Sequence, residues 1–323
     1  MHMHSEIAAL RRDPTSQRRR QIAMETARQD WLESDVAIHI QRDFARFADG
    51  EPLADLPALA RLISDRSAAS LYVDAFVRAF IEIYQREPLG EMPFRQNASE
   101  GFARLQLMQA NSAMLSLNVY EPVAVTDDHE TAQFHDCELN EIVIAGSGRA
   151  RIHRRGHCSN KEIKIVSTAH DWHPGSVNIL RRNRDARDVL FVDQSLLILQ
   201  LSRTPSSPLP SFEYRLSDGT LLQQASGDKR ASQQLMALSV LGALEHSDAI
   251  DPIDTFARNS DQDRDARWEG IRQLLALDSA RGFALLTVIA ERDEDQLAKP
   301  ARDLRDQLLT AHPALRQFER EIA

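Results

Sequence analysis

The chain contains few cysteines, few lysines and no long apolar run. Cys137 and Cys158 are its two cysteines, so at most one disulfide forms and no disulfide framework supports the fold. No stretch approaches the roughly 18 to 20 apolar residues that span a bilayer, and residues 1–20 lack the apolar segment of a signal peptide. We therefore expect a cytoplasmic protein with reduced thiols and no membrane partner.

Several sequence motifs with a known chemical role are also missing. The chain has no GxGxxG dinucleotide turn, no GxxxxGK phosphate loop and no GxSxG nucleophile elbow. No serine can be assigned to a His/Asp pair from the sequence alone. The formal net charge of -9 argues against a protein that binds nucleic acid through its phosphates, so we expect no nucleic-acid partner.

The length and composition indicate a globular protein with more than one domain. The residues are 42% hydrophobic and 27% charged, so the chain has enough apolar surface to form hydrophobic cores. Its length of 323 residues exceeds that of one small module. The periodicity changes twice along the chain. We predict an α+β multidomain protein with a helical N-terminal region at 1–98, an antiparallel β-barrel at 99–215 and a helical domain at 216–323.

The first region follows helical spacing. Val73, Phe76, Phe80 and Ile83 form one apolar stripe at i, i+3 and i+4 intervals. Further helices are predicted over 16–39 and 56–63, and Asp55 before Pro57 is the expected cap of the second of these.

From about Phe102 the apolar period becomes two, and the residues are typical of strands. Eight short candidates follow one another with Gly, Asn, Asp and Pro between them and no helical segment in between. This pattern favours an antiparallel sandwich or a closed barrel over a parallel βαβ sheet. One long strand is expected over 132–146, and the turn at Gly146 and Gly148 is interpreted as a hairpin.

An internal repeat is visible in the last hundred residues. At an offset of 33 residues, apolar positions match apolar positions, a period that is typical of stacked helix pairs. The spacing resembles that of HEAT-like repeats, which implies a surface for a protein partner. The predicted apolar seam between the stacked helices consists of Leu244, Ile253, Phe256, Leu277, Leu286 and Ile289.

Histidine and cysteine are concentrated in the predicted barrel. Both cysteines and six histidines fall between 129 and 173, which suggests a metal site or a proton-transfer site: His129, His135, His153, His157, His170 and His173. Because side chains alternate along a strand, His135, Cys137 and Glu141 should share one face. The same alternation places Arg149, Arg151 and His153 on the outer face of the next strand, so we expect His153 at the surface.

The segment 149–187 carries a formal charge of +7 inside an acidic protein, with ten basic and three acidic residues. One explanation is an anionic ligand or partner surface, and the other is a genome composition that favours arginine codons. The candidate ligand-binding residues are Arg149, Arg151, Arg181, Arg182 and Arg187.

The spacing around the first histidines resembles the first motif of the cupin superfamily of small β-barrels. His135-Asp-Cys137, three residues, Glu141, six residues and Gly148 reproduce that motif, with cysteine in place of the second histidine. The resemblance covers residues 100–204 and implies a divalent metal inside the barrel, iron foremost, and the layout is also similar to that of thiol dioxygenases. In the second motif, Asn178 stands where a metal histidine is expected. The implied ligand set is therefore His135, Cys137, Glu141 and Asn178, with His173, His170 or His129 as a replacement.

Three functional hypotheses follow, and the sequence does not decide whether the protein is an enzyme. The first is a divergent cupin that binds an anionic small molecule or peptide, with catalysis left open. The second is a mononuclear metal-dependent oxygenase. The third is a scaffold that acts through its helical repeats. Structural roles stand beside these: Cys137 as a small buried apolar residue, and Glu141 as the partner of an arginine.

Overall fold

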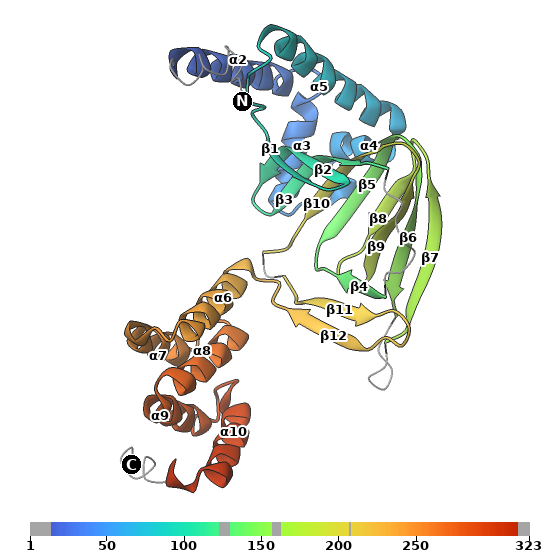
Figure 1. The fold of residues 1–323 in the computed structure, drawn as a ribbon. Helices are drawn as coiled ribbons and strands as arrows, with labels where there is room; N and C mark the ends of the chain where they lie inside the picture. The colour runs from blue at the N-terminus through green and yellow to red at the C-terminus, as the bar shows by residue number, and fades with distance from the viewer. Residues whose placement is uncertain (1–13, 123–129, 157–162, 207, 316–323) are drawn as a thin grey trace, which may run out of the picture. The chain divides into compact units, whose positions relative to one another are not determined.

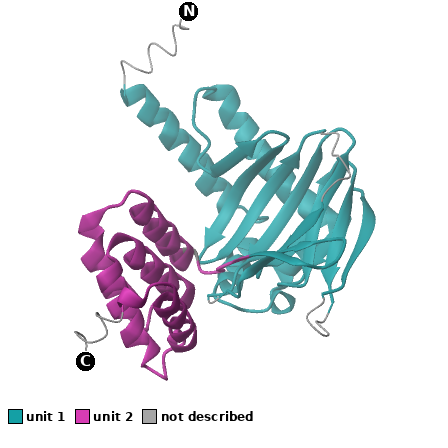
Figure 2. Ribbon diagram, turned by 60° about the horizontal axis from the view of Figure 1, so that its bottom comes forward, with its two compact units in different colours: residues 1–223 teal, residues 224–323 magenta. Residues whose placement is uncertain are grey.

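The computed structural model describes residues 14–122, 130–156, 163–206 and 208–315. The chain forms two compact units, residues 1–223 and 224–323 (Figure 2). The first unit holds the N-terminal helices and the strands, and the second holds the C-terminal helices (Figure 1).

The N-terminal region is helical, as predicted, but the helix expected over 16–39 ends at Leu32 and a separate helix begins at Ile38. The helices are α2 (Pro14–Leu32), α3 (Ile38–Ala48), the short 3-10 helix η1 (Leu53–Asp55), α4 (Pro57–Ser64) and α5 (Arg66–Arg86). Val73, Phe76, Phe80 and Ile83 of α5 are buried, as the spacing predicts. Asp55 does not cap α4. Instead, the Asp43 carboxylate of α3 accepts a hydrogen bond of 2.8 Å from the Ala58 N–H. A residue of α3 thus satisfies a free amide at the start of α4.

Twelve strands are described in three sheets. Their bounds are β1 (Arg95–Ser99), β2 (Phe102–Ala110), β3 (Ala113–Tyr120), β4 (Thr131–Phe134), β5 (Glu138–Ala145), β6 (Gly148–Arg155), β7 (Ile165–Trp172), β8 (Val177–Leu180), β9 (Asp185–Val192), β10 (Leu196–Arg203), β11 (Ser211–Arg215) and β12 (Leu221–Ala225). The sheet orders are β1-β2-β3-β10-β5-β8, β7-β6-β9 and β12-β11-β4. The registers of the paired strands are antiparallel, which confirms the predicted strand direction.

The two faces of the six-stranded sheet have different surroundings. Leu115, Leu117 and Ile142 belong to one apolar core together with the side chains of α2 to α5. Val143 and Ile198, on the opposite face, pack instead with residues of β6, β7 and β9. The predicted boundary at 98/99 therefore falls inside the first unit, because helices and sheet share one core. The three-way division of the chain stays a prediction.

Two local predictions in the middle of the chain are wrong. The segment 132–146 is not one strand but two, β4 and β5, which lie in different sheets. The break is at Asp136, whose buried carboxylate accepts Arg182 Nε at 2.8 Å and the Leu209 N–H at 2.7 Å. The turn at Gly146 is not a hairpin either, because β5 and β6 pair with different neighbours.

The second unit is helical. It consists of α6 (Lys229–Ala243), the 3-10 helix η2 (Ser247–Ala249), α7 (Ile250–Arg258), α8 (Arg264–Leu277), α9 (Ser279–Ala290), α10 (Ala298–Ala311) and the 3-10 helix η3 (Pro313–Leu315). Ile253, Leu286 and Ile289 of the predicted seam are fully buried, and Phe256 and Leu277 pack against them. Leu244 is 69% exposed, because it follows the end of α6 rather than lying within it, and its place in the seam was wrong. The repeat assignment stays a prediction.

A search of the helices within the described residues finds no segment with both the length and the apolar character needed to cross a membrane.

Candidate functional site

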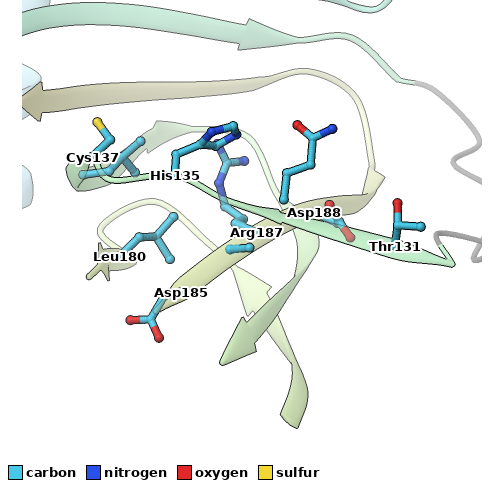
Figure 3. Close-up of a pocket in the computed structure, with 10 residues that line it drawn as sticks. Thr131, His135, Cys137, Leu180, Asp185, Arg187 and Asp188 are labelled. Atoms are coloured by element: carbon cyan, nitrogen blue, oxygen red, sulfur yellow. The ribbon is translucent and has the colours of Figure 1, made fainter. Parts of the chain in front are cut away.

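A cavity of about 380 Å³ opens where β4, β5, β8 and β9 meet in the first unit. It is lined by Thr131, Gln133, His135, Cys137, Leu139, Leu180, Asp185, Ala186, Arg187 and Asp188. Figure 3 shows that Thr131, His135 and Cys137 come from β4 and the segment after it, while Asp185, Arg187 and Asp188 come from β9. His135, Cys137 and Leu139 line the same cavity, although His135 and Cys137 lie between β4 and β5 rather than on the one strand that was predicted.

Arg187 is the buried cation of this cavity. Its Nη2 donates to Glu141 Oε1 at 2.9 Å and to the Tyr120 hydroxyl at 3.2 Å. Its guanidinium carbon lies 5.3 Å from the ring centre of Trp172 and 5.8 Å from that of Tyr120. The Arg187 side chain is 12% exposed and the Glu141 side chain is 0% exposed. The strands therefore hold a charged pair inside the sheet sandwich, with aromatic faces around the guanidinium.

Glu141 belongs to a polar group on the inner face of the six-stranded sheet. Gln200 and Asn178 are its register partners on β10 and β8. Asn118 Nδ2 donates to Gln200 Oε1 at 2.7 Å, and Arg104 Nε donates to Asn118 Oδ1 at 3.0 Å. Burial raises the pKa of the Glu141 carboxyl, because no water solvates its charge, although Arg187 and Arg104 favour the charged form.

Two buried polar atoms in this group have no hydrogen-bond partner among the described residues. They are Glu141 Oε2, an acceptor, and Asn178 Nδ2, a donor. An unsatisfied buried polar atom is costly, so a pair of them beside one another is a feature that needs an explanation. Glu141 and Asn178 are paired across β5 and β8, two residues along the ladder from the pair Leu139 and Leu180. Leu139 and Leu180 line the cavity.

The residues that the cupin resemblance assigns to a metal do not fit a tight metal site in this structure. Glu141 is bonded to a guanidinium, and burial raises the pKa of the Cys137 thiol, which disfavours the thiolate that a metal needs. His135 and His173 are exposed, and His135 Nδ1 lies 3.1 Å from the Ser211 hydroxyl. Within the described residues no group of three or more His, Cys, Asp or Glu side chains could hold a metal ion. His129 lies outside those residues.

The five candidate arginines do not gather around one cavity. Arg187 lines the cavity just described, and Arg182 lines a different one, where it pairs with Asp136. Arg149 pairs with Asp171 on the neighbouring strand, and Arg181 pairs with Asp185. Arg151 also interacts with another group. Three of the five candidate arginines are thus paired with nearby carboxylates at partly exposed positions, while the side chain of Arg187 is 12% exposed and pairs with the buried Glu141.

One residue expected at the surface is buried. His153 is 0% exposed, although the face on which alternation placed it is correct. That face is covered: Arg155, two residues further on, lies over the rings of Phe134, Phe212 and Tyr214 from β4 and β11. The sequence carried no signal for this cover, because β4 and β11 are distant in the chain from β6.

Comparisons with known proteins give a weak likeness of fold. No protein-family model matches the chain, and no curated protein matches its sequence. Solved structures match parts of it with TM-scores too low to carry an argument. The 7S globulin of Momordica charantia is 15% identical over 38% of this chain and 35% of its own, with a TM-score of 0.26. The chain thus spans about a third of that globulin.

Two other matches have similar values. A putative mannose-6-phosphate isomerase from Ralstonia eutropha is 13% identical over 33% of this chain and 89% of its own, with a TM-score of 0.25. The CENP-C cupin domain of Drosophila melanogaster is 12% identical over 34% of this chain and 74% of its own, with a TM-score of 0.27. Cupin-superfamily proteins are therefore among the structural neighbours, at low coverage, and this chain's function has to be argued from its own residues.

Proposed function

We propose that the first unit binds a small anionic molecule in the cavity between β4, β5, β8 and β9. The observation that carries the proposal is Arg187, a cationic residue that lines the cavity although its side chain is only 12% exposed. Arginine is always charged and offers several N–H donors in one plane, which suits a carboxylate or phosphate group. His135, Gln133 and Thr131 add further polar groups on the wall contributed by β4 and the segment after it.

The charges around the cavity are compatible with such a ligand. Asp185 is buried and accepts Arg181 Nε at 2.8 Å and Arg154 Nε at 3.2 Å, so two cations offset its charge. The Asp188 carboxylate is hydrogen-bonded to His153 Nε2. Glu141 offsets the charge of Arg187, and burial raises the pKa of the Glu141 carboxyl.

Isothermal titration calorimetry with succinate and inorganic phosphate tests the proposal, with glycerol as the uncharged comparison. We expect at least one anion to bind the wild-type protein and glycerol not to bind. Replacing Arg187 alone would leave Glu141 buried without a partner, which is destabilising in itself. The informative variant is therefore the double substitution R187Q with E141Q, which keeps hydrogen-bonding groups and removes both charges. It should weaken anion binding at least tenfold, about 1.4 kcal/mol.

The matched control is R149Q, because Arg149 pairs with Asp171 at the surface and does not line the cavity. It should bind the anion as the wild type does. The proposal fails if neither anion binds the wild type, or if R149Q weakens binding as much as the double variant.

A further inference from the structure

Three side chains on the second sheet form a continuous hydrogen-bonded chain. Ser167 Oγ of β7 lies 2.8 Å from His153 Nδ1 of β6, and His153 Nε2 lies 2.8 Å from Asp188 Oδ2 of β9. We propose that Ser167, His153 and Asp188 are a nucleophile, base and orienting carboxylate for acyl transfer from small carboxylic esters. This site does not depend on the anion bound at Arg187.

The strand register explains why these residues meet. In the β7-β6-β9 sheet, His153 is directly opposite Ser167 on one side and Ala186 on the other. Asp188 is two residues beyond Ala186 and therefore projects from the same face of the sheet. Neighbours directly opposite and on the diagonal are within reach of long side chains. The three groups converge because the sheet fixes their backbones rather than because a loop folds over them.

The hydrogen-bond pattern suits one direction of proton transfer. An ionised carboxylate only accepts, so in the proposed arrangement Asp188 accepts the Nε2–H of His153. Nδ1 then carries the lone pair, and the Ser167 hydroxyl donates to it. This is the arrangement in which a base takes the proton of a serine nucleophile while a carboxylate holds the base in one tautomer. The two ring nitrogens are exchanged relative to the serine proteases, and the acid–base chemistry of the imidazole is the same.

The burial of the three groups differs in a way that suits this role. His153 is 0% exposed, while Ser167 is exposed and accessible to a substrate. The Asp188 side chain is 22% exposed. Ser167 lies on β7, which is an edge strand of its sheet in the described part of the chain. A purely structural histidine would make the same two hydrogen bonds, so the two roles differ in the reactivity of the Ser167 oxygen.

The acyl-transfer step balances without another reactant. The Ser167 oxygen forms a bond to the ester carbonyl carbon, and its proton passes to His153 Nδ1. The bond from that carbon to the alkoxy oxygen breaks, and the leaving alcohol takes the proton from His153. Water then attacks the acyl-serine in the same way, gives its proton to His153, and releases the carboxylic acid and the original hydroxyl.

Labelling with a fluorophosphonate, followed by peptide mass spectrometry, tests the nucleophile. Ser167 displaces fluoride from phosphorus, so we expect one covalent adduct on the peptide that contains Ser167 in the full-length protein. S167A should carry no adduct. S195A is the control, since Ser195 is an exposed serine on the loop between β9 and β10, and it should be labelled as the wild type is. Absence of an adduct, or an adduct that persists in S167A, overturns the proposal.

Hydrolysis of p-nitrophenyl acetate tests the two other groups. We expect S167A and H153Q to lose the activity, and D188N to lower kcat by about 10² to 10⁴-fold because the ring would no longer be held in the productive tautomer. Asp188 acts through His153, so D188N should leave KM nearly unchanged, and D188E should recover part of kcat. If D188N reduces kcat no more than it reduces the folded fraction measured by circular dichroism, Asp188 is only structural and the proposal fails.

Discussion

Arg267 of α8 is a charged residue buried in the core of the second unit. Its side chain is 3% exposed, and it donates to both oxygens of Asp295, at 3.1 and 2.7 Å, and to the Ala257 carbonyl at 3.0 Å. Three hydrogen bonds thus join the start of α8 to the end of α7 and to the segment before α10. A charge in this position is tolerated only because each of its partners is in place.

Removing the guanidinium should therefore cost much more than removing a surface arginine. R267M leaves Asp295, whose side chain is 5% exposed, without its cation, and we expect a loss of about 3 to 5 kcal/mol. R281M is the control in the same unit, because Arg281 pairs with Asp251 and Asp254 at the surface, and this variant should change stability much less than R267M does. Hydrogen exchange of the α8 and α10 peptides measures the loss of stability in both variants. Equal losses would contradict the role given to the buried pair.

The same pair predicts a dependence on pH. The hydrogen bonds from Arg267 hold the pKa of the Asp295 carboxyl below its usual range. A lowered pKa in the folded state stabilises the fold above the unfolded pKa of about 3.9, and this stabilisation is lost as the pH falls through the folded pKa. Unfolding of the second unit should therefore become easier below about pH 4. D295N, compared at pH 7 and pH 3 by hydrogen exchange, should show a smaller change than the wild type.

Single residues were the least predictable feature from the sequence. Alternation along one strand predicted a shared face for His135, Cys137 and Glu141, whereas His135 and Cys137 lie between β4 and β5 and line a cavity that Glu141 does not line. The partner of Glu141 was not predictable, because Arg187 is 46 residues away and reaches it only after β9 is placed opposite β5. The same limit applies to His153, whose two partners lie on two other strands. Short-range patterns give the face of a residue, while its partner depends on the topology.

Elements were predicted well where the pattern stayed uniform. The period of two over 102–110 and 113–120 corresponds to β2 and β3, and the stripe around Phe76 corresponds to α5. The prediction failed at 132–146, where the apolar alternation continues through Asp136 while the chain leaves one sheet and enters another. A polar residue inside an alternating run was the available signal for that break, and the cation that stabilises it, Arg182, is distant in sequence.

The turn between β5 and β6 depends on glycine. Gly146 has φ +84°, and a Cβ atom there would lie 1.8 Å from the Ser195 carbonyl oxygen. G146A should therefore be destabilised both by the backbone conformation and by the clash, by about 2 kcal/mol or more. Gly50 is the matched control, since its φ is +108° and a Cβ there meets nothing within 4 Å. G50A carries the conformational cost alone. Thermal unfolding should show a lower Tm for G146A than for G50A, and the reverse order would contradict the close approach.

At the scale of the molecule, the shared core joins the N-terminal helices to the six-stranded sheet. Leu115, Leu117, Ile142, Leu199 and Leu201 are buried on the sheet face that belongs to the same core as α2 to α5. Exposing one such side chain costs roughly 1.5 to 3 kcal/mol, so uncovering all of them costs an amount similar to the whole stability of a domain, about 5 to 15 kcal/mol. The helices are therefore part of the folding unit of the sheets.

This argument predicts how fragments of the chain should behave. Residues 1–225 and 226–323, expressed separately, should each unfold cooperatively, because each contains its own buried core. Residues 99–225, without the helices, should fail to fold or should aggregate, since the apolar sheet face would meet water. Circular dichroism, size-exclusion chromatography and thermal unfolding of the three fragments check this. A soluble 99–225 fragment with a cooperative transition would mean that the sheets form an independent domain, as the sequence periodicity alone had indicated.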